Sequence, residues 1–343
     1  YAVNGTQVME INTLFQLLSM KRAQSPQLQI ADRLLFTPDL FSFFLTGEAN
    51  TEYTIASTSE MLNATTRTWD WPLIDRIGLP RHLFCPIVMP GTVRGQLRAD
   101  IAEETGLGRV DVIAVGSHDT ASAVAAVPAK ADECPVAFIS SGTWSLLGVE
   151  LDAPILTEEA RRAQFTNEGG IGGTITFLQN ITGLWFLQRL MAEWADEGDE
   201  QQYEPLLAAA ERAEIQTVIP VDAPEFQNPK SMQQAIRGYC ERQALNVPQT
   251  KADLTRVVLQ SLAAKYAEAT QALNAMLPEP IKKLHIIGGG SQNKLLNRLT
   301  QQALGIPVEA GPVEATAIGN ILTQALAKGE VADIHEMRSI AIV

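Results

Sequence analysis

Two ionisable side chains stand between an apolar run and a run of small residues. The stretch VDVIAVGSHDTASAVAAVP, residues 110–128, places His118 and Asp119 at this junction. The carboxyl end of a strand in an open α/β sheet is where such sheets bind ligands, and the start of a helix favours an ionised carboxylate. Asp119 could then accept a proton from a hydroxyl, since phosphoryl transfer requires only a weak base. The plainer interpretation is a helix N-cap.

Two glycine-containing stretches could hold phosphate oxygens. SSGTWS, residues 140–145, places a glycine among hydroxyl side chains, and such a turn can direct amides and hydroxyls at an anion. IIGGGSQN, residues 286–293, puts three glycines after a predicted strand and lets a ligand approach the backbone closely. It fits neither GxGxxG nor the Walker A pattern. An ordinary hairpin and an ordinary loop are the plainer alternatives.

A third stretch, NITGLWFLQ, holds two amide side chains. We interpret Asn180 as the cap of a helix that begins near Thr182, and Gln188 as a residue two turns into that helix. Neither residue indicates any chemistry by itself.

Helices and strands must position these residues. Residues 1–60 read as mainly helical, with a helix starting near Pro38 and ending at Gly47. Residues 110–115 read as a strand, 120–126 as a short helix, and the stretch CPVAFISSGTWSLLGVELD, residues 134–152, as two strands joined by a tight turn. A long helix is predicted over 251–277. From residue 284 to 329 strand and helix alternate, which predicts a sheet with parallel neighbours.

Composition excludes several classes of protein. The 343 residues suffice for more than one domain. The net charge of −13 argues against a nucleic-acid binder and against attachment to an anionic membrane. Three separated cysteines indicate reduced thiols rather than a metal site. Because no apolar run is long enough for a membrane span and no signal peptide is recognisable, we expect a cytoplasmic protein.

The order of these motifs resembles the FGGY carbohydrate kinases, a family with the ribonuclease-H-like fold of the actin-like ATPases. The similarity is carried by stretches over nearly the whole chain: TPDLFSFFLTGEANTEYT, GSHDTASAV, SSGTWSLLG, TNEGG, NITGLWFLQR, APEFQNPKSM, LHIIGGGSQN and AGPVEATAIGN. The resemblance implies an α/β fold with two domains, the first incomplete. Residues 1–130 would be the latter part of the N-terminal sugar-binding domain, and 131–343 the C-terminal nucleotide-binding domain.

Within the family the stretches are most similar to kinases that phosphorylate L-rhamnulose on its 1-hydroxyl in L-rhamnose catabolism, using ATP and Mg²⁺. The resemblance implies that Asp119 is the proton acceptor and that the sugar is contacted by His118, Asp119 and Thr120. It places ATP against Thr143, Asn180, Gln188 and Gly289, and assigns no residue as a metal ligand. The expected partners are the sugar and ATP, without nucleic acid or membrane, and the expected state is a monomer or weak homo-oligomer.

The chain departs from the family pattern at its start. The D-x-G-x-x-S phosphate loop with which the family opens does not occur, a sugar-contacting glycine is absent, and the family's C-terminal tail is missing. Because a preorganised phosphate clamp supplies most of the catalysis in this chemistry, we expect the 343-residue chain alone to have little or no kinase activity. The alternatives are another FGGY kinase with a different ketose or polyol, and a non-catalytic sugar-binding protein on the kinase fold.

Overall fold

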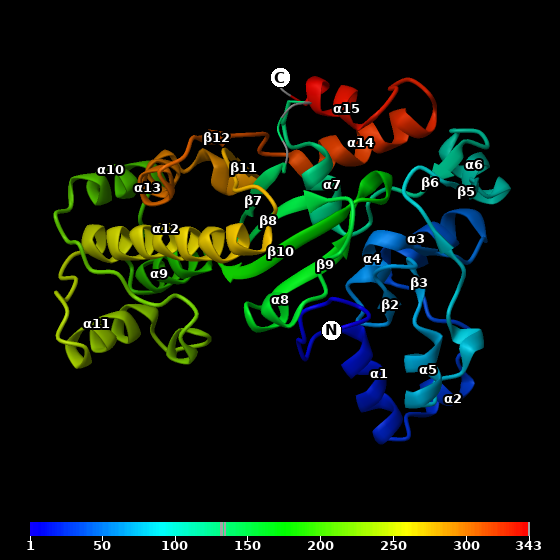
Figure 1. The fold of residues 1–343 in the computed structure, drawn as a ribbon, viewed down its shortest axis with the longest axis horizontal. Coiled ribbons are helices and arrows are strands. Elements are labelled where there is room, and N and C mark those ends of the chain that lie inside the picture. Colours follow the sequence, from blue (N-terminus) through cyan, green and yellow to red (C-terminus); the bar gives the residue numbers. More distant parts are fainter. Residues whose placement is uncertain (131–132, 134, 342–343) are drawn as a thin grey trace. The chain divides into compact units, whose positions relative to one another are not determined.

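The computed structural model describes residues 1–130, 133 and 135–341. The chain divides into two compact units. Figure 1 colours the ribbon by position in the sequence, so the segments of each unit can be located by their residue numbers. Unit 1 comprises Tyr1–Pro135, Val149–Leu178 and Glu314–Val343, and unit 2 comprises Val136–Gly148 and Gln179–Val313. The domain boundary predicted between residues 130 and 131 falls at the edge of the described residues, and it stays a prediction.

Unit 1 is mainly helical, as its sequence predicted for residues 1–60. Its helices are α1 (Thr13–Arg22), α2 (Pro26–Ile30), α3 (Thr37–Thr46), α4 (Tyr53–Ser57), α5 (Trp71–Ile77), α6 (Ala99–Thr105), α7 (Asp119–Ala125), α8 (Glu158–Arg162), α14 (Ala315–Ala327) and α15 (Ile334–Ile340), with 3-10 turns η1 (Arg81–Leu83) and η2 (Ile171–Gly173). Its short strands are β1 (Thr51–Glu52), β2 (Leu62–Asn63), β3 (Thr68–Trp69), β4 (Ile87–Val88), β5 (Val93–Gln96), β6 (Asp111–Ile113) and β9 (Phe165–Gly169).

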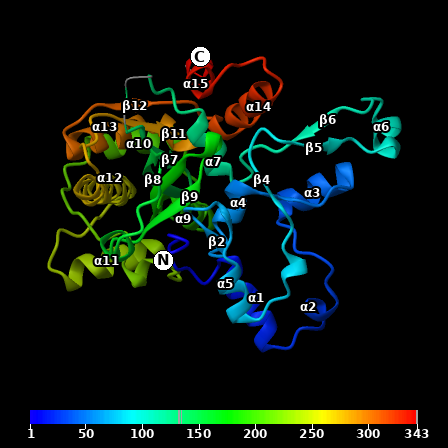
Figure 2. The ribbon, with the colours of Figure 1, turned by 45° about the vertical axis from the view of Figure 1, so that its right-hand side comes forward.

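Local signals set several of these boundaries. Helix α3 has Pro38 in its first turn and ends at Gly47, whose φ of 82° is the left-handed conformation that a glycine adopts without strain. Both ends are where the sequence predicted them. Strands β5 and β6, which are connected through α6, form a two-stranded antiparallel sheet. Figure 2 shows these two strands beside α3.

Unit 2 places helices around parallel strands. Strands β7 (Ala137–Ser141), β11 (Leu284–Ile287) and β12 (Val308–Ala310) pair in the order β12-β11-β7, and both pairings are parallel, as predicted. Helix α12 (Lys251–Met276) begins at a capping box formed by Thr250 and Asp253. It packs against two other helices of the unit (Figure 1), α10 (Tyr203–Arg212) and α13 (Lys294–Leu304). The remaining elements are α9 (Trp185–Asp196), α11 (Met232–Arg242), η3 (Pro224–Phe226) and η4 (Gly289–Gln292).

Two long strands are each divided between the units. These are β8 (Trp144–Leu151) and β10 (Ile175–Thr182), which lie in a six-stranded sheet of order β12-β11-β7-β8-β10-β9. Strands β7 and β8 are joined by only Gly142 and Thr143, which confirms the predicted tight turn. Within the described residues, none of the helices has the length and apolar character needed to cross a membrane.

The thiols that the structure describes are free. Cys85 and Cys240 are buried and form no disulfide, in agreement with the prediction of reduced thiols. Cys134, the third residue of that prediction, lies outside the described residues.

Candidate active site

The segment that carries His118 and Asp119 links a short strand to a short helix. Strand β6 is only three residues long and pairs antiparallel with β5, outside the six-stranded sheet. The rule for ligand sites at the ends of parallel strands therefore does not apply to Asp119. Helix α7 starts at Asp119, with His118 at the N-cap position. The N-cap interpretation of Asp119 is wrong as well, since its Oδ1 accepts the amide of Thr120, its direct neighbour, at 2.8 Å.

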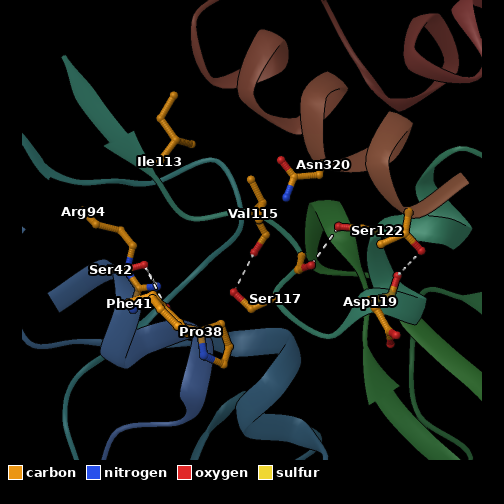
Figure 3. A pocket seen from close by; sticks show the side chains of 12 residues that line it. Pro38, Phe41, Ser42, Arg94, Ile113, Val115, Ser117, Asp119, Ser122 and Asn320 are labelled. Atoms are coloured by element: carbon orange, nitrogen blue, oxygen red, sulfur yellow. Dashed lines mark hydrogen bonds between the residues drawn. The ribbon is translucent and has the colours of Figure 1, made fainter. Parts of the chain in front are cut away.

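A pocket of about 360 Å³ opens beside Asp119 within unit 1. The Asp119 side chain is 80% exposed, so its carboxylate is free to meet a solute. Figure 3 shows Pro38, Phe41 and Arg94 on one side of the pocket and Asp119 and Asn320 on the other. Mainly polar side chains complete the lining, with some apolar ones: Ser42, Ile113, Val115, Gly116, Ser117, Ser122 and Thr316.

His118 lies between two carboxylates. Its Nδ1 is 3.2 Å from Oε2 of Glu168, and its Nε2 is 3.7 Å from Oδ1 of Asp119. Glu168 is on β9, where the next amide, that of Gly169, donates to Ser57 Oγ of α4 at 2.7 Å. The Glu168 side chain is only 9% exposed, whereas that of Asp119 is open to solvent. This geometry fixes the imidazole so that Nε2 faces the exposed carboxylate.

The surroundings of His118 favour its charged form. Burial lowers the pKa of His118, but the negative charge of Glu168 and its contact with Nδ1, together with the charges of Asp119 and Glu52, raise it by more. The net shift is upward from 6.5, so a cation beside Asp119 persists to higher pH than for an ordinary histidine. Because the pKa of His118 is raised in the folded protein, the charged imidazole stabilises the fold. This stabilisation is fully present below pH 6.5 and is lost as the pH rises through the folded-state pKa of His118.

Substitution Glu168→Gln tests this account of His118. Burial lowers the pKa of His118, and the carboxylate charge of Glu168 offsets this effect. Without that charge we expect the pKa of His118 to fall relative to the unsubstituted protein. An NMR titration of the imidazole signals between pH 4 and 9 would measure the change. The signals of His335, an exposed residue on α15, should be the same in both proteins. An unaltered His118 titration would contradict the assignment of Glu168 as its partner.

The predicted phosphate-binding turn lies in unit 2. Thr143 Oγ1 donates to Oε1 of Gln188 at 3.2 Å, so the structure brings together two residues 45 positions apart that the family resemblance places against ATP. The carbonyls of Gly142 and Thr143 accept the amides of Leu184 and Trp185 at 3.0 and 3.2 Å. The turn is thereby fixed to the first residues of α9. Gln188 is in the first turn of this helix rather than two turns in, because α9 begins at Trp185 and not near Thr182.

The glycine triplet lies beside the same hairpin. Strands β7 and β11 are parallel neighbours with Ser140 opposite Ile287, so the loops that follow them emerge at the same edge of the sheet. Gly288 has a φ of 82°, and a Cβ there would be 2.9 Å from the carbonyl oxygen of Ser141. At Gly289 a Cβ would meet nothing within 4 Å. The backbone of Gly289 is therefore open to a ligand, as a nucleotide contact requires.

The prediction for Asn180 needs a correction. Asn180 lies in β10, two residues before the end of that strand, and not at the cap of a helix. The stretch ITFLQNIT, residues 175–182, is almost wholly buried and has the β-branched content of a strand. Asn180 belongs to unit 2 with the other nucleotide candidates. His118, Asp119 and Thr120 all belong to unit 1.

The two implied cofactors differ in how they fit the chain. The exposed Gly289 backbone and the hydroxyl of Thr143 suit a nucleotide, whose phosphates take amide and hydroxyl donors. For the metal, the described residues contain no group of three or more His, Cys, Asp or Glu side chains placed to hold an ion. The described side chains therefore do not fit a metal ion held by the protein alone.

Both halves of the chain match known domains. Residues 1–126 match the N-terminal domain of the FGGY family of carbohydrate kinases, and residues 137–328 match the C-terminal domain of that family.

Relatives with similar sequences carry one name. A rhamnulokinase from Bacteroides thetaiotaomicron is 46% identical over 99% of this chain, which spans 69% of the relative. A rhamnulokinase from Pectobacterium carotovorum subsp. carotovorum is 42% identical over 98% of this chain, which spans 66% of that relative. The chain thus has about two thirds of the length of these proteins.

Solved structures share the fold at low identity. A ligand-bound xylulose kinase from Lactobacillus acidophilus superposes with a TM-score of 0.78 at 16% identity, covering 99% of this chain and 68% of the other. Plasmodium falciparum glycerol kinase with ADP gives a TM-score of 0.77 at 13% identity, with the same coverage of each chain. At such identities the likeness shows the fold alone.

Proposed function

Because the chain belongs to the FGGY family of carbohydrate kinases, we propose that it takes part in the ATP-dependent phosphorylation of L-rhamnulose on its 1-hydroxyl. The observation that carries this proposal is the exposed Asp119 carboxylate in the lining of a pocket, beside His118, which is paired with the buried Glu168. The two relatives named rhamnulokinase support the choice of sugar. Mg²⁺ would accompany ATP as the counter-ion of its phosphates.

The proposed step is an in-line transfer of the γ-phosphoryl group to the sugar. The oxygen of the sugar's 1-hydroxyl forms a bond to the γ-phosphorus of ATP, the bond from that phosphorus to the β,γ-bridging oxygen breaks, and ADP leaves. The hydroxyl proton passes to the Asp119 carboxylate. Because this transition state is loose and the proton leaves late, an ordinary carboxylate is basic enough.

The neighbouring residues take supporting roles in this proposal. His118, oriented by Glu168, donates a hydrogen bond from Nε2 to an oxygen of the sugar, and Thr120 contacts the same substrate. Thr143, Gln188, Asn180 and Gly289 contact ATP. The pair formed by Thr143 and Gln188 supports this assignment for two of the four.

A sugar panel tests the proposed function. The assay measures coupled ADP release by the protein together with any residues that its gene places before Tyr1 or after Val343. We expect kcat/KM for L-rhamnulose to exceed that for D-xylulose, D-gluconate and glycerol by at least about 10²-fold. A single apolar contact or hydrogen bond to the substrate can change the ratio of two kcat/KM values by that factor or more. A higher value for another sugar would favour a different FGGY kinase. Sugar binding without any ADP release would favour the non-catalytic alternative.

A further inference from the structure

The three residues before Asp119 have no regular secondary structure of their own. Gly116, Ser117 and His118 lie between the end of β6 and the start of α7. An irregular segment holds an adjacent side chain in place only if its backbone groups are bonded to something rigid. The partners of these backbone groups therefore decide how well the Asp119 carboxylate is positioned.

Two of the amides in this segment are bonded to residues more than sixty positions earlier. The amide of Ser117 donates to Oε2 of Glu52 at 3.1 Å, and the amide of His118 donates to Oγ1 of Thr54 at 3.1 Å. From the other side, the carbonyl of Gly116 accepts from Ser122 Oγ of α7 at 2.7 Å. All of these residues belong to unit 1.

Glu52 is a fully buried carboxylate that accepts four hydrogen bonds. Besides the amide of Ser117, it accepts the Thr54 amide at 2.8 Å, the Thr54 hydroxyl at 2.6 Å and the Ile55 amide at 3.2 Å. The Thr54 hydroxyl has only one proton, and because it donates that proton to Glu52 it must present a lone pair to the amide of His118. Glu52 thus holds Ser117 directly and orients the acceptor that holds His118.

Capping of α4 does not by itself require a glutamate. Glu52 is the N-cap of this five-residue helix, a position at which Ser, Thr, Asp and Asn are the preferred residues. Burying a carboxylate is costly unless its lone pairs are satisfied, and here one of the four donors is the Ser117 amide of a distant loop. The contact with that loop accounts for the longer acidic side chain. Glu52 is itself fixed, since its amide donates to Oδ1 of Asp39, which is paired with Arg94.

We propose that Glu52, acting with Thr54, is a positioning residue that holds His118 and Asp119 in the geometry required for phosphoryl transfer. This inference rests on the proposed function, because it assigns Glu52 a role in that reaction. Glu52 does not itself line the pocket beside Asp119. It acts through the backbone of Ser117, which does line the pocket, and through the hydroxyl of Thr54.

Substitution Glu52→Gln is expected to lower kcat about 10- to 100-fold while leaving the KM for ATP unchanged. The side-chain NH₂ of glutamine is a donor in place of an acceptor oxygen, so it faces the N–H and O–H donors that Glu52 satisfies and frees the loop. A displacement of about 1 Å can cost that much in rate. The Ser117 and His118 amides should also exchange hydrogen for deuterium faster than in the unsubstituted protein. Thr54→Val should accelerate exchange at His118 and lower kcat, and Thr54→Ser, which keeps the hydroxyl, should restore both.

Asp70→Asn is the matched control. Asp70 is also a buried N-cap carboxylate, accepting the amide of Leu73 at 3.2 Å at the start of α5. This variant, like Glu52→Gln, replaces a buried capping carboxylate by a neutral amide, but it should keep the kcat and the exchange rates at Ser117 and His118.

Three outcomes would overturn the inference. Unchanged kcat and unchanged exchange in Glu52→Gln would show that Glu52 only caps α4. Equal losses in Asp70→Asn would show that general destabilisation explains the effect. If the unsubstituted protein, with any residues that its gene places before Tyr1 or after Val343, releases no ADP with any sugar, the proposed function fails and the catalytic part of the inference fails with it. The exchange rates still report whether Glu52 anchors the loop.

Discussion

Substitution Asp119→Asn is expected to lower kcat for sugar phosphorylation about 10²- to 10⁴-fold, the range over which a positioned proton acceptor contributes to enzymatic rates. Asparagine has the shape of aspartate but takes up no proton. The affinity for ATP should be unchanged, because the candidate nucleotide residues lie in the other compact unit. Coupled ADP release at saturating substrates would measure kcat, and calorimetry would measure ATP binding.

A surface aspartate provides the control for this variant. Asp100 is exposed on α6 and is paired with Arg98 at 2.8 Å, so Asp100→Asn removes a similar charge without touching the pocket. It should leave kcat within about twofold, since exposed ion pairs contribute little. Retention of full activity in Asp119→Asn would contradict its role as proton acceptor. Loss of ATP binding together with activity would indicate a structural role.

The largest expected effect on stability comes from Gly319→Ala. Gly319 is in α14, which packs against α7, and an added Cβ would lie 1.8 Å from the carbonyl oxygen of Ser122 and 2.7 Å from its carbonyl carbon. Both atoms belong to backbone, so the contact can be relieved only by moving one helix away from the other. Overpacking of this kind costs about 1–3 kcal/mol. Urea denaturation would measure the loss in free energy of unfolding.

A second helical glycine provides the opposite expectation. Gly238 lies in α11, and an added Cβ there would meet only Nη1 of Arg242 at 3.2 Å, the end of a flexible side chain. Gly238→Ala should therefore be neutral or stabilising by up to about 1 kcal/mol, because alanine is the better helix former. Equal stability changes in the two variants would contradict the close contact between α14 and α7.

Strong local patterns were enough to predict several elements. Gly47 ends α3 because its positive φ suits glycine, and residues 142–143 leave room for nothing but a tight turn between β7 and β8. Alternating strand and helix after residue 284 predicted the parallel pairing of β11 with β12. In each case the information lies within a few residues along the chain.

Other features depend on which strands pair with one another, and local sequence patterns do not reveal this. The strand predicted over residues 110–115 is shorter, and its partner β5 had not been predicted as a strand. Asn180 was interpreted as a helix cap because it precedes the helix start predicted near Thr182, whereas it lies inside the buried strand β10. A short apolar run is compatible with either a strand or a helix, and only the tertiary partners decide.

Two acidic residues of the candidate site could not be found from the sequence. Glu52 and Glu168 contact the segment 117–118 across 65 and 50 positions of the chain, and no spacing rule covers such distances. The stretches TEYT and TNEGG that contain them both occur in the family resemblance, but with no role attached. The one local signal was a glutamate before a short helix, where a shorter polar residue is usual.

In the proposed reaction, phosphate passes from ATP to the 1-hydroxyl of L-rhamnulose while Asp119 takes the proton. ³¹P and ¹³C NMR of reaction mixtures containing ATP, Mg²⁺ and L-rhamnulose would identify the product. The unsubstituted protein and Asp119→Asn are run in parallel, each with any residues that the gene places before Tyr1 or after Val343. We predict a phosphate ester on C1 with the unsubstituted protein and none with the variant over the same time. No ester, an ester at another carbon, or equal amounts in the two reactions would contradict the claim.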